Sequence, residues 1–303
     1  MLAKLAKSLL VASGIILAAP TLIVHAKSIQ TLKSEQVTEN VSVITVGSTK
    51  FHTFHGISNS HIIETKNELR MIDAQFNFKL AKALKKYIDT LGKPLVQIIL
   101  SHNHPDHWYG TEIFATTTAI ATSKNVMNDL KTGGMRYIKA MQKNPKMKDN
   151  IPGKVIVPSI EIALGKQNWD GLEVIVEEYP DQEAHHSLLI KIPAYGIMIG
   201  QDLFYNKMFL VASERGRNNN WRNILARFKA SEAKTYKTLL VGHGKNGGPS
   251  ILDQDIEYLD ALEATLKKGL SKEETTKEMI AKFPEKGGKG MLGISMRNLF
   301  QGH

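Results

Sequence analysis

The segment HNHPDH at positions 102–107 holds three imidazoles and one carboxylate within six residues. An imidazole or carboxylate that is buried without a partner loses its hydration at a cost in free energy. Four such side chains in one turn therefore indicate that a ligand binds there. Alternate residues of an extended turn point the same way, which lets His102 and His104 converge on one ion. Asp106 and His107 can then face a second ion. The proline between them restricts the backbone and lowers the entropy lost when the ligands order. The segment therefore predicts a metal site.

The elements around this segment indicate how it is held. It follows the apolar run 94–101, which is typical of a buried strand. A helix is expected over 77–93, ending at Gly92, because its apolar residues recur at helical spacing. A second helix is expected over 125–144, interrupted by glycines at its middle. Further strands are expected over 41–58, 60–66, 68–76, 153–164, 172–180, 187–204 and 235–243. Helices are expected from about Trp221, over 250–268 and over 272–283. Because strands followed by a helix occur twice, two packed sheets with helices outside are favoured.

The amino-acid composition limits which metal ligands and which partners are expected. The 303 residues include no cysteine, which excludes disulfides and thiolate ligands. Any metal must bind imidazole and carboxylate groups, which suit zinc and similar ions. The formal charge is +10, or +8 without Lys4 and Lys7. The basic residues are scattered with little aromatic interleaving, so we expect a solvated basic surface and no nucleic-acid partner.

The first 26 residues predict a secretory signal peptide. They begin with lysines, continue with an apolar run from Leu9 to Ala19 and end in Val24-His25-Ala26. Gly14 and Pro20 interrupt the run, which is shorter than the roughly 20 residues that span a bilayer. We expect cleavage after Ala26, one domain over 27–303, no stable membrane insertion of the mature chain, and a periplasmic or secreted location. The sequence leaves the oligomeric state open.

The H-x-H-x-D-H pattern resembles the signature of the metallo-β-lactamase superfamily, and the resemblance extends from about Val41 to the C-terminal region. It implies an α+β fold, a four-layer αββα sandwich that binds two metal ions at one edge of its sheets. The family pattern continues with a third ligand ten positions before the proline that ends a strand, here Pro193, which selects Glu183. Histidine is usual there, and glutamate resembles the alkylsulfatase-like branch. His185 and His186 are the alternatives, with His185 preferred of the two.

The resemblance also assigns the remaining ligands. Asp202 ends an apolar strand and resembles the carboxylate that bridges the two ions, although Gln201 separates it from the expected glycine. His243, at the end of another strand, completes the set. Asp73 resembles an aspartate that supports the metal loop from behind. Three other residues are possible substrate contacts: Trp108, Tyr205 and Asn206. Three histidines near the first hairpins are expected mostly at the surface: His52, His55 and His61.

Together these assignments imply an exported dinuclear zinc hydrolase. Two divalent ions lower the pKa of a shared water, and the resulting hydroxide attacks a small-molecule substrate. Asp106 would orient that hydroxide or carry a proton. The leading substrates are cyclic amides or esters, namely β-lactams, with antibiotic resistance as a consequence, or lactones. Glu183 and the basic charge favour sulfate or phosphate esters as the alternative. A protein that binds metal or an anionic surface without catalysis is the non-enzymatic alternative.

Overall fold

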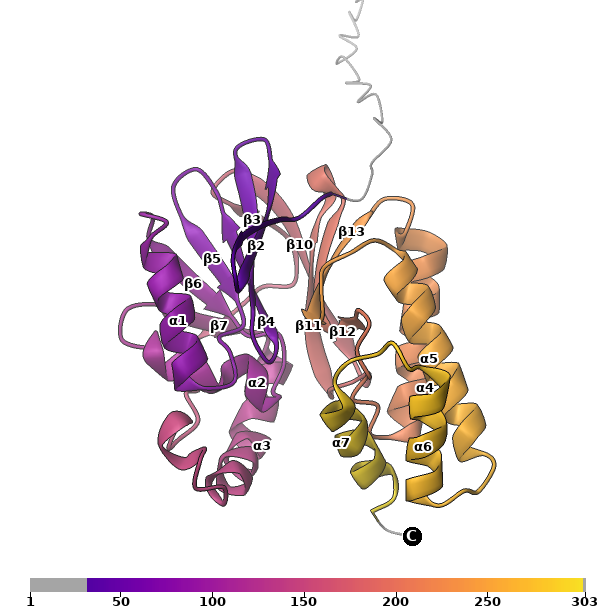
Figure 1. Cartoon of the computed structure of the whole chain (residues 1–303). Coiled ribbons are helices and arrows are strands. Elements are labelled where there is room, and N and C mark those ends of the chain that lie inside the picture. Colours follow the sequence, from indigo (N-terminus) through magenta and orange to yellow (C-terminus); the bar gives the residue numbers. More distant parts are fainter. Residues whose placement is uncertain (1–31, 302–303) are drawn as a thin grey trace, which may run out of the picture.

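The computed structural model describes residues 32–301, so the expected signal peptide lies outside the described residues. Two β-sheets lie face to face, with helices on both outer faces (Figure 1). This arrangement confirms the four-layer α+β sandwich expected from the sequence. Within the described residues, no helix combines the length and apolar character that crossing a bilayer requires.

The first sheet has eight strands in chain order. Neighbouring strands are antiparallel up to the fifth and parallel from the fifth to the eighth. The strands are β1 (Glu35–Thr38), β2 (Val41–Val46), β3 (Thr49–His55), β4 (Asn59–Glu64), β5 (Leu69–Ile72), β6 (Leu95–Ile99), β7 (Ala119–Thr122) and β8 (Ile160–Glu161). The parallel pair β5 and β6 matters most for the site, because both strands end beside the 102–107 segment.

The second sheet has five strands in the order β13-β12-β11-β10-β9. The pair β12 and β13 is parallel, and the other pairs are antiparallel. The strands are β9 (Gly165–Trp169), β10 (Leu172–Pro180), β11 (His186–Ile192), β12 (Ile197–Tyr205) and β13 (Thr238–His243). Because β12 and β13 run parallel, their C-terminal ends meet at one edge, where Tyr205 pairs with His243.

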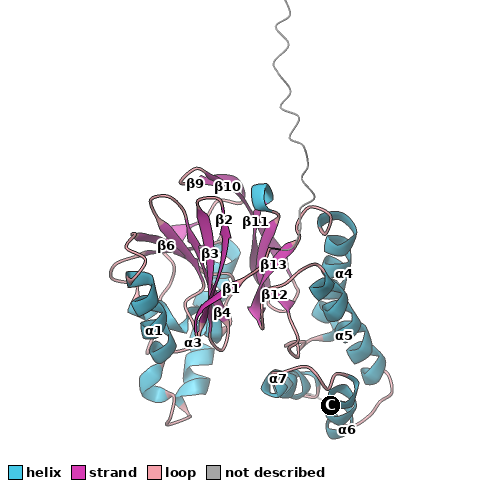
Figure 2. Ribbon diagram, turned by 45° about the horizontal axis from the view of Figure 1, so that its top comes forward, coloured by secondary structure: helices cyan, strands magenta, loops and turns pink. Residues whose placement is uncertain are grey.

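The helices cover the outer faces of the sheets (Figure 2). The first sheet carries α1 (Phe78–Asp89) and α3 (Lys124–Gln142), and the short α2 (Pro105–Trp108) lies between them in the chain. The second sheet carries α4 (Arg215–Arg227), α5 (Ser250–Leu266), α6 (Lys272–Lys282) and α7 (Lys289–Leu299). The Asn77 side chain caps α1 by accepting from the Leu80 amide, and Ala81, Leu84 and Ile88 form its buried stripe.

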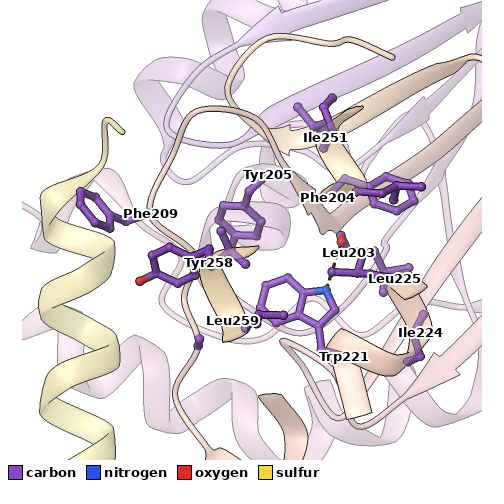
Figure 3. Close-up of a cluster of buried hydrophobic side chains, with 14 of the residues drawn as sticks. Leu203, Phe204, Tyr205, Phe209, Trp221, Ile224, Leu225, Ile251, Tyr258 and Leu259 are labelled. Atoms are coloured by element: carbon purple, nitrogen blue, oxygen red, sulfur yellow. Dashed lines mark hydrogen bonds between the residues drawn. The ribbon is translucent and has the colours of Figure 1, made fainter. Parts of the chain in front are cut away.

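Apolar side chains fill the space between all four layers. Isoleucines and valines of the two sheets pack against each other in the central layer. Aromatic residues dominate the layer between the second sheet and its helices, where Tyr205, Phe209, Trp221 and Tyr258 are fully buried (Figure 3). The Trp221 indole N–H donates to the Leu203 carbonyl at 3.1 Å, so this buried polar group is satisfied.

Three expected elements differ from the structure. The second helix, α3, is continuous through Gly133 and Gly134; a Cβ at Gly134 would lie 2.7 Å from a Val155 methyl carbon, so close packing explains a glycine there. The expected strand over 153–164 shrinks to the two residues of β8. Helix α4 begins at Arg215 rather than near Trp221, and α7 was not expected.

Candidate metal centre

The 102–107 segment leaves the buried strand β6 and turns at once into α2. Pro105 occupies the first turn of α2, where its fixed φ fits and its missing N–H is not needed. The Leu100 amide and Thr122 hydroxyl tie the end of β6 to β7, donating to Ala121 and Leu100 carbonyls at 2.9 and 2.7 Å. The Ala74 amide holds α2 by donating to the His107 carbonyl at 2.8 Å. Because strand and helix are both anchored, the intervening histidines have little freedom.

The other three ligand candidates come from the second sheet. Glu183 lies in the loop before β11, Asp202 lies within β12, and His243 ends β13. Gly242 is required beside them, because a Cβ there would meet the Asp202 carboxylate. The structure therefore brings residues far apart in sequence to one edge of the sandwich.

One group of side chains consists of His102, His104 and Glu183, with Asp202 at its border. The Glu183 Oε2 atom lies 2.9 Å from His104 Nδ1 and 3.6 Å from His102 Nε2. His185, the alternative third ligand, has a side chain 61% exposed and lies 3.6 Å from Asp181 Oδ1 instead. The structure thus groups Glu183, and not His185, with the first two histidines.

A second group consists of Asp106, His107 and His243. Asp106 Oδ2 lies 3.5 Å from His107 Nε2 and 3.4 Å from His243 Nε2. Asp202 stands between the two groups: its Oδ1 lies 3.2 Å from His107 Nε2, and its Oδ2 lies 3.2 Å from His243 Nε2 and 3.9 Å from His102 Nε2. This is the position that a bridging carboxylate needs.

Several buried polar atoms at this centre lie 2.9–3.6 Å from a polar atom of another ligand candidate, but in orientations that form no hydrogen bond among the described residues. They are His102 Nε2, His107 Nε2, Glu183 Oε2 and Asp202 Oδ1. Orphaned buried nitrogen and oxygen atoms are rare in proteins and require an explanation. Imidazole nitrogens and carboxylate oxygens directed at common points are a donor set that fits divalent ions such as zinc. The residues present therefore fit divalent metal ions.

Asp73 anchors the centre from behind. Its Oδ2 accepts from His107 Nδ1, the Ser101 hydroxyl and Gln201 Nε2, each at 2.6 Å, and its Oδ1 accepts from the Ser101 amide at 2.7 Å. The Ser101 hydroxyl also lies 2.9 Å from His102 Nδ1. Such contacts fix which ring nitrogen faces the metal. The supporting role expected for Asp73 matches this geometry.

Sequence reasoning missed the contribution of Gln201. It adopts a left-handed backbone with φ 45° at a register shift between β12 and β13. The residue that separates Gly200 from Asp202 is thus an inserted residue in a bulge, and its amide adds a donor to Asp73. The sequence signal for this bulge was the presence of Gln201 between Gly200 and Asp202, where the family pattern has glycine followed directly by aspartate.

The charges of the centre shift one another's pKa values. Burial alone would lower the pKa of His243, but the carboxylates of Asp202 and Asp106 outweigh burial and raise it to about 10. The same balance raises the pKa of His107 well above its usual value. Burial would raise the pKa of Asp202, yet His107 and His243 hold it well below its ordinary range. Bound cations would replace these protons, so metal binding must release protons.

A family model described as the metallo-beta-lactamase superfamily matches residues 54–243, which include every ligand candidate. The chain belongs to the metallo-β-lactamase superfamily. No curated protein matches it.

Several solved structures have a fold similar to that of this chain. A metallo-β-lactamase from Pontibacter korlensis has a TM-score of 0.55 at 17% identity, covering 76% of this chain and 99% of that one. VMB-1 has a TM-score of 0.52 at 17% identity, covering 75% and 96%. A double mutant of the sec-alkyl sulfatase PisA1 has a TM-score of 0.61 at 17% identity, covering 86% of this chain. The match spans only 49% of that sulfatase. At these identities the likeness shows the fold.

Two of the three expected substrate contacts lie in the core of this metallo-β-lactamase-fold chain, which corrects that expectation. Trp108 is fully buried, and its indole N–H donates to the Asn103 carbonyl at 2.9 Å. Tyr205 is also fully buried, and its hydroxyl donates to Asp202 Oδ2 at 2.9 Å. Tyr205 therefore orients the Asp202 carboxylate and is not placed to meet substrate. Asn206 is half-buried and donates to the Lys245 carbonyl at 2.7 Å.

The expected surface position of the early histidines is wrong for two of the three. His52 and His61 are buried on β3 and β4, and His55 is half-buried. His61 Nε2 lies 3.1 Å from the Val241 carbonyl, and burial lowers the pKa of His61 to about 3. Being neutral, His61 can tie β4 to β13 beneath the metal centre. The neighbouring Asn59 side chain donates to the Val241 and Gly244 carbonyls on either side of His243.

Proposed function

We propose that this protein is a hydrolase that binds two zinc ions and uses them to activate water. The observation that carries the proposal is the set of orphaned buried atoms on His102, His107, Glu183 and Asp202, which converge on two neighbouring points. Two divalent ions would supply a water of lowered pKa and an electrophile for the substrate. His102, His104 and Glu183 would hold one ion, Asp106, His107 and His243 the other, and Asp202 would contact both.

Asp106 is the acid–base candidate among the ligands. Its side chain is 20% exposed, whereas the side chains of His107 and His243 beside it are 0% and 3% exposed. It therefore reaches the mouth of the site, where a proton must pass to the leaving group. In the metal-free chain the two histidines hold its pKa well below the ordinary range against the effect of burial, so it is ionised and available as a ligand.

A cyclic amide or ester is the leading substrate class. The match to a metallo-β-lactamase spans 76% of this chain and 99% of that enzyme, so the present chain includes the extent of that enzyme's fold. Hydrolysis of a sulfate or phosphate ester is the second candidate. It is favoured by Glu183 in the third ligand position and by the similarity of 86% of this chain to part of an alkyl sulfatase.

The test is a turnover assay on the zinc-loaded chain with three substrates: a chromogenic cephalosporin, a lactone and an aryl sulfate. We expect EDTA-sensitive hydrolysis of at least one, with zinc content near two per chain by elemental analysis. Zinc binding without turnover of any of them would favour the non-enzymatic alternative, a metal-binding protein. Absence of zinc binding would overturn the proposal.

We also propose that residues 1–26 direct export to the periplasm or beyond. Cell fractionation of the tagged full chain tests this, with a shift in mass that corresponds to cleavage after Ala26 as the expected result.

A further inference from the structure

Two of the ligand candidates reach solvent. Of the seven ligand candidates, His104 and Asp106 have side chains about one-fifth exposed, at 21% and 20%, while the other five are 3% exposed or less. A substrate must therefore approach past His104 and Asp106.

A cavity of about 320 Å³ adjoins this mouth at His104. Its walls come from the ligand loop, α3, the segment before β11, and α4, so both halves of the sandwich contribute. In Figure 1, α3 and α4 lie on opposite sides of the two sheets. The lining residues are Asn103, His104, Asp129, Thr132, Gly133, Arg136, Tyr137, His185 and Arg217.

Two arginines dominate the charge of this cavity. Arg136 is exposed on α3 and forms no ion pair with any described carboxylate; its guanidinium lies 5.4 Å from the centre of the Tyr137 ring. Arg217 on α4 uses Nε to bind Glu214 at 2.9 Å, and among the described residues nothing accepts from its terminal nitrogens. The one carboxylate in the lining, Asp129, is already bound to His186 at 2.8 Å.

Tyr137 lines the same cavity as the two arginines. Burial raises the pKa of its hydroxyl, while Arg136 and Arg217 pull it down. The Tyr137 ring also packs edge-on against His104, with ring centres 6.0 Å apart. The two cations, one from each half of the molecule, therefore flank a neutral hydroxyl donor directly beside a metal ligand.

We propose that Arg136 and Arg217 bind an anionic group of the substrate, so that the enzyme selects substrates with a carboxylate, sulfate or phosphate over neutral ones. Guanidinium groups bind such anions through paired charge-assisted hydrogen bonds. The side-chain amide of Asn103, which also lines the cavity, adds a neutral donor. The inference rests on the proposed function, because it concerns the substrate of the same site.

The test is calorimetric binding to the zinc-loaded full chain, without turnover. The probes are benzoate, benzenesulfonate and phenylphosphonate, with neutral benzamide as the matched control. We expect the three anions to bind and benzamide not to bind. The anion with the highest affinity indicates which anionic group the substrate carries. Arg136→Gln and Arg217→Gln should each weaken anion binding about tenfold, the loss expected for one charge-assisted contact. Arg217→Lys keeps the charge without the paired geometry and should give an intermediate loss.

Arg215→Gln is the matched control on the same helix, because Arg215 binds Glu263 on α5 and does not line the cavity. It should leave anion binding unchanged. Unchanged affinity in both Arg136→Gln and Arg217→Gln, or equal binding of benzamide, would overturn the proposal. Zinc content of each variant is measured separately. Absence of zinc from the unmodified chain would count against the proposed function. Normal zinc content together with anion binding that does not depend on the arginines would count only against the anion-binding proposal.

Discussion

The two halves of the metal centre share Asp202 and carry one further carboxylate each, but they are supported differently. In one half, His107 Nδ1 lies 2.6 Å from Asp73, and His243 Nδ1 lies 2.9 Å from the Ile57 carbonyl. In the other half, His102 Nδ1 lies 2.9 Å from the Ser101 hydroxyl, but His104 Nδ1 faces Glu183 itself. Both histidines of the first half are thus held by the scaffold, whereas only one histidine of the second half is, and His104 lines the cavity. We expect the Asp106/His107/His243 half to bind metal more tightly.

Asp202→Asn should have the largest effect, because it removes the charge that both halves share. We expect loss of at least one ion per chain and a fall in activity of more than about 100-fold, beyond what loss of a supporting contact causes. Elemental analysis and turnover measure both. The Tyr205 hydroxyl can still donate to the remaining carbonyl oxygen, so folding should persist. Retention of two tightly bound ions would mean that Asp202 does not bridge.

Glu183→Gln tests whether the two halves of the centre bind metal independently. It should empty the His102/His104 half while the other half keeps its ion, so zinc content should fall from two to about one and activity by about 100-fold. His185→Ala is the control, because that exposed side chain lies outside the ligand group. It should keep two ions. Metal loss in His185→Ala, but not in Glu183→Gln, would reverse the assignment of the third ligand.

The contrast between the halves also explains what the sequence could predict. His102, His104, Asp106 and His107 are close in sequence, so spacing alone indicated their convergence. Asp202 and His243 required the resemblance, since a single residue at a strand end carries little signal. The support of the centre was largely unpredictable. It depends on contacts between strands, such as Gln201 with Asp73, which no local pattern encodes.

Other misses have the same cause. Trp108 directly follows His107 and Tyr205 lies three residues after Asp202, so both were expected at the site, but a helix and a strand direct their side chains into the core. Alternation along β3 and β4 did not reveal that both faces of those strands are buried, which placed His52 and His61 inside. The layered fold was predictable because apolar strands and amphipathic helices are local patterns.

Asp73→Asn should affect mainly the better supported half. It removes the charge that holds the Nδ1 proton of His107 and should lower metal affinity there by about 10- to 100-fold. Competition with a zinc chelator measures the loss for each ion. An equal loss in both halves would show that Asp73 acts through the whole loop, by way of Ser101, and would contradict the proposed difference.

The smallest expected effect concerns Asp255, which belongs to the scaffold behind Asp202. It should change the free energy of unfolding and leave the metal content of both halves unchanged. Asp255 on α5 accepts from the Tyr205 amide at 2.9 Å through Oδ2, while its Oδ1 has no partner among the described residues. Burial raises its pKa from 3.8 to about 8, against the opposing effects of that amide and of Lys286. Between about pH 4 and 8 the folded chain therefore keeps a proton that the unfolded chain has lost, so this group's contribution to stability falls as the pH rises.

Asp255→Asn stays neutral throughout and can still accept from Tyr205. It should raise the free energy of unfolding at pH 8 by at least about 1 kcal/mol relative to the unmodified chain, and by less at pH 5. Urea titrations at the two pH values measure the difference. Asp253→Asn, at an exposed site on the same helix, should show no such pH dependence. A pH-independent gain would assign the benefit to packing, whereas a loss at both pH values would mean that the charged carboxylate is needed to hold Tyr205 against Asp202.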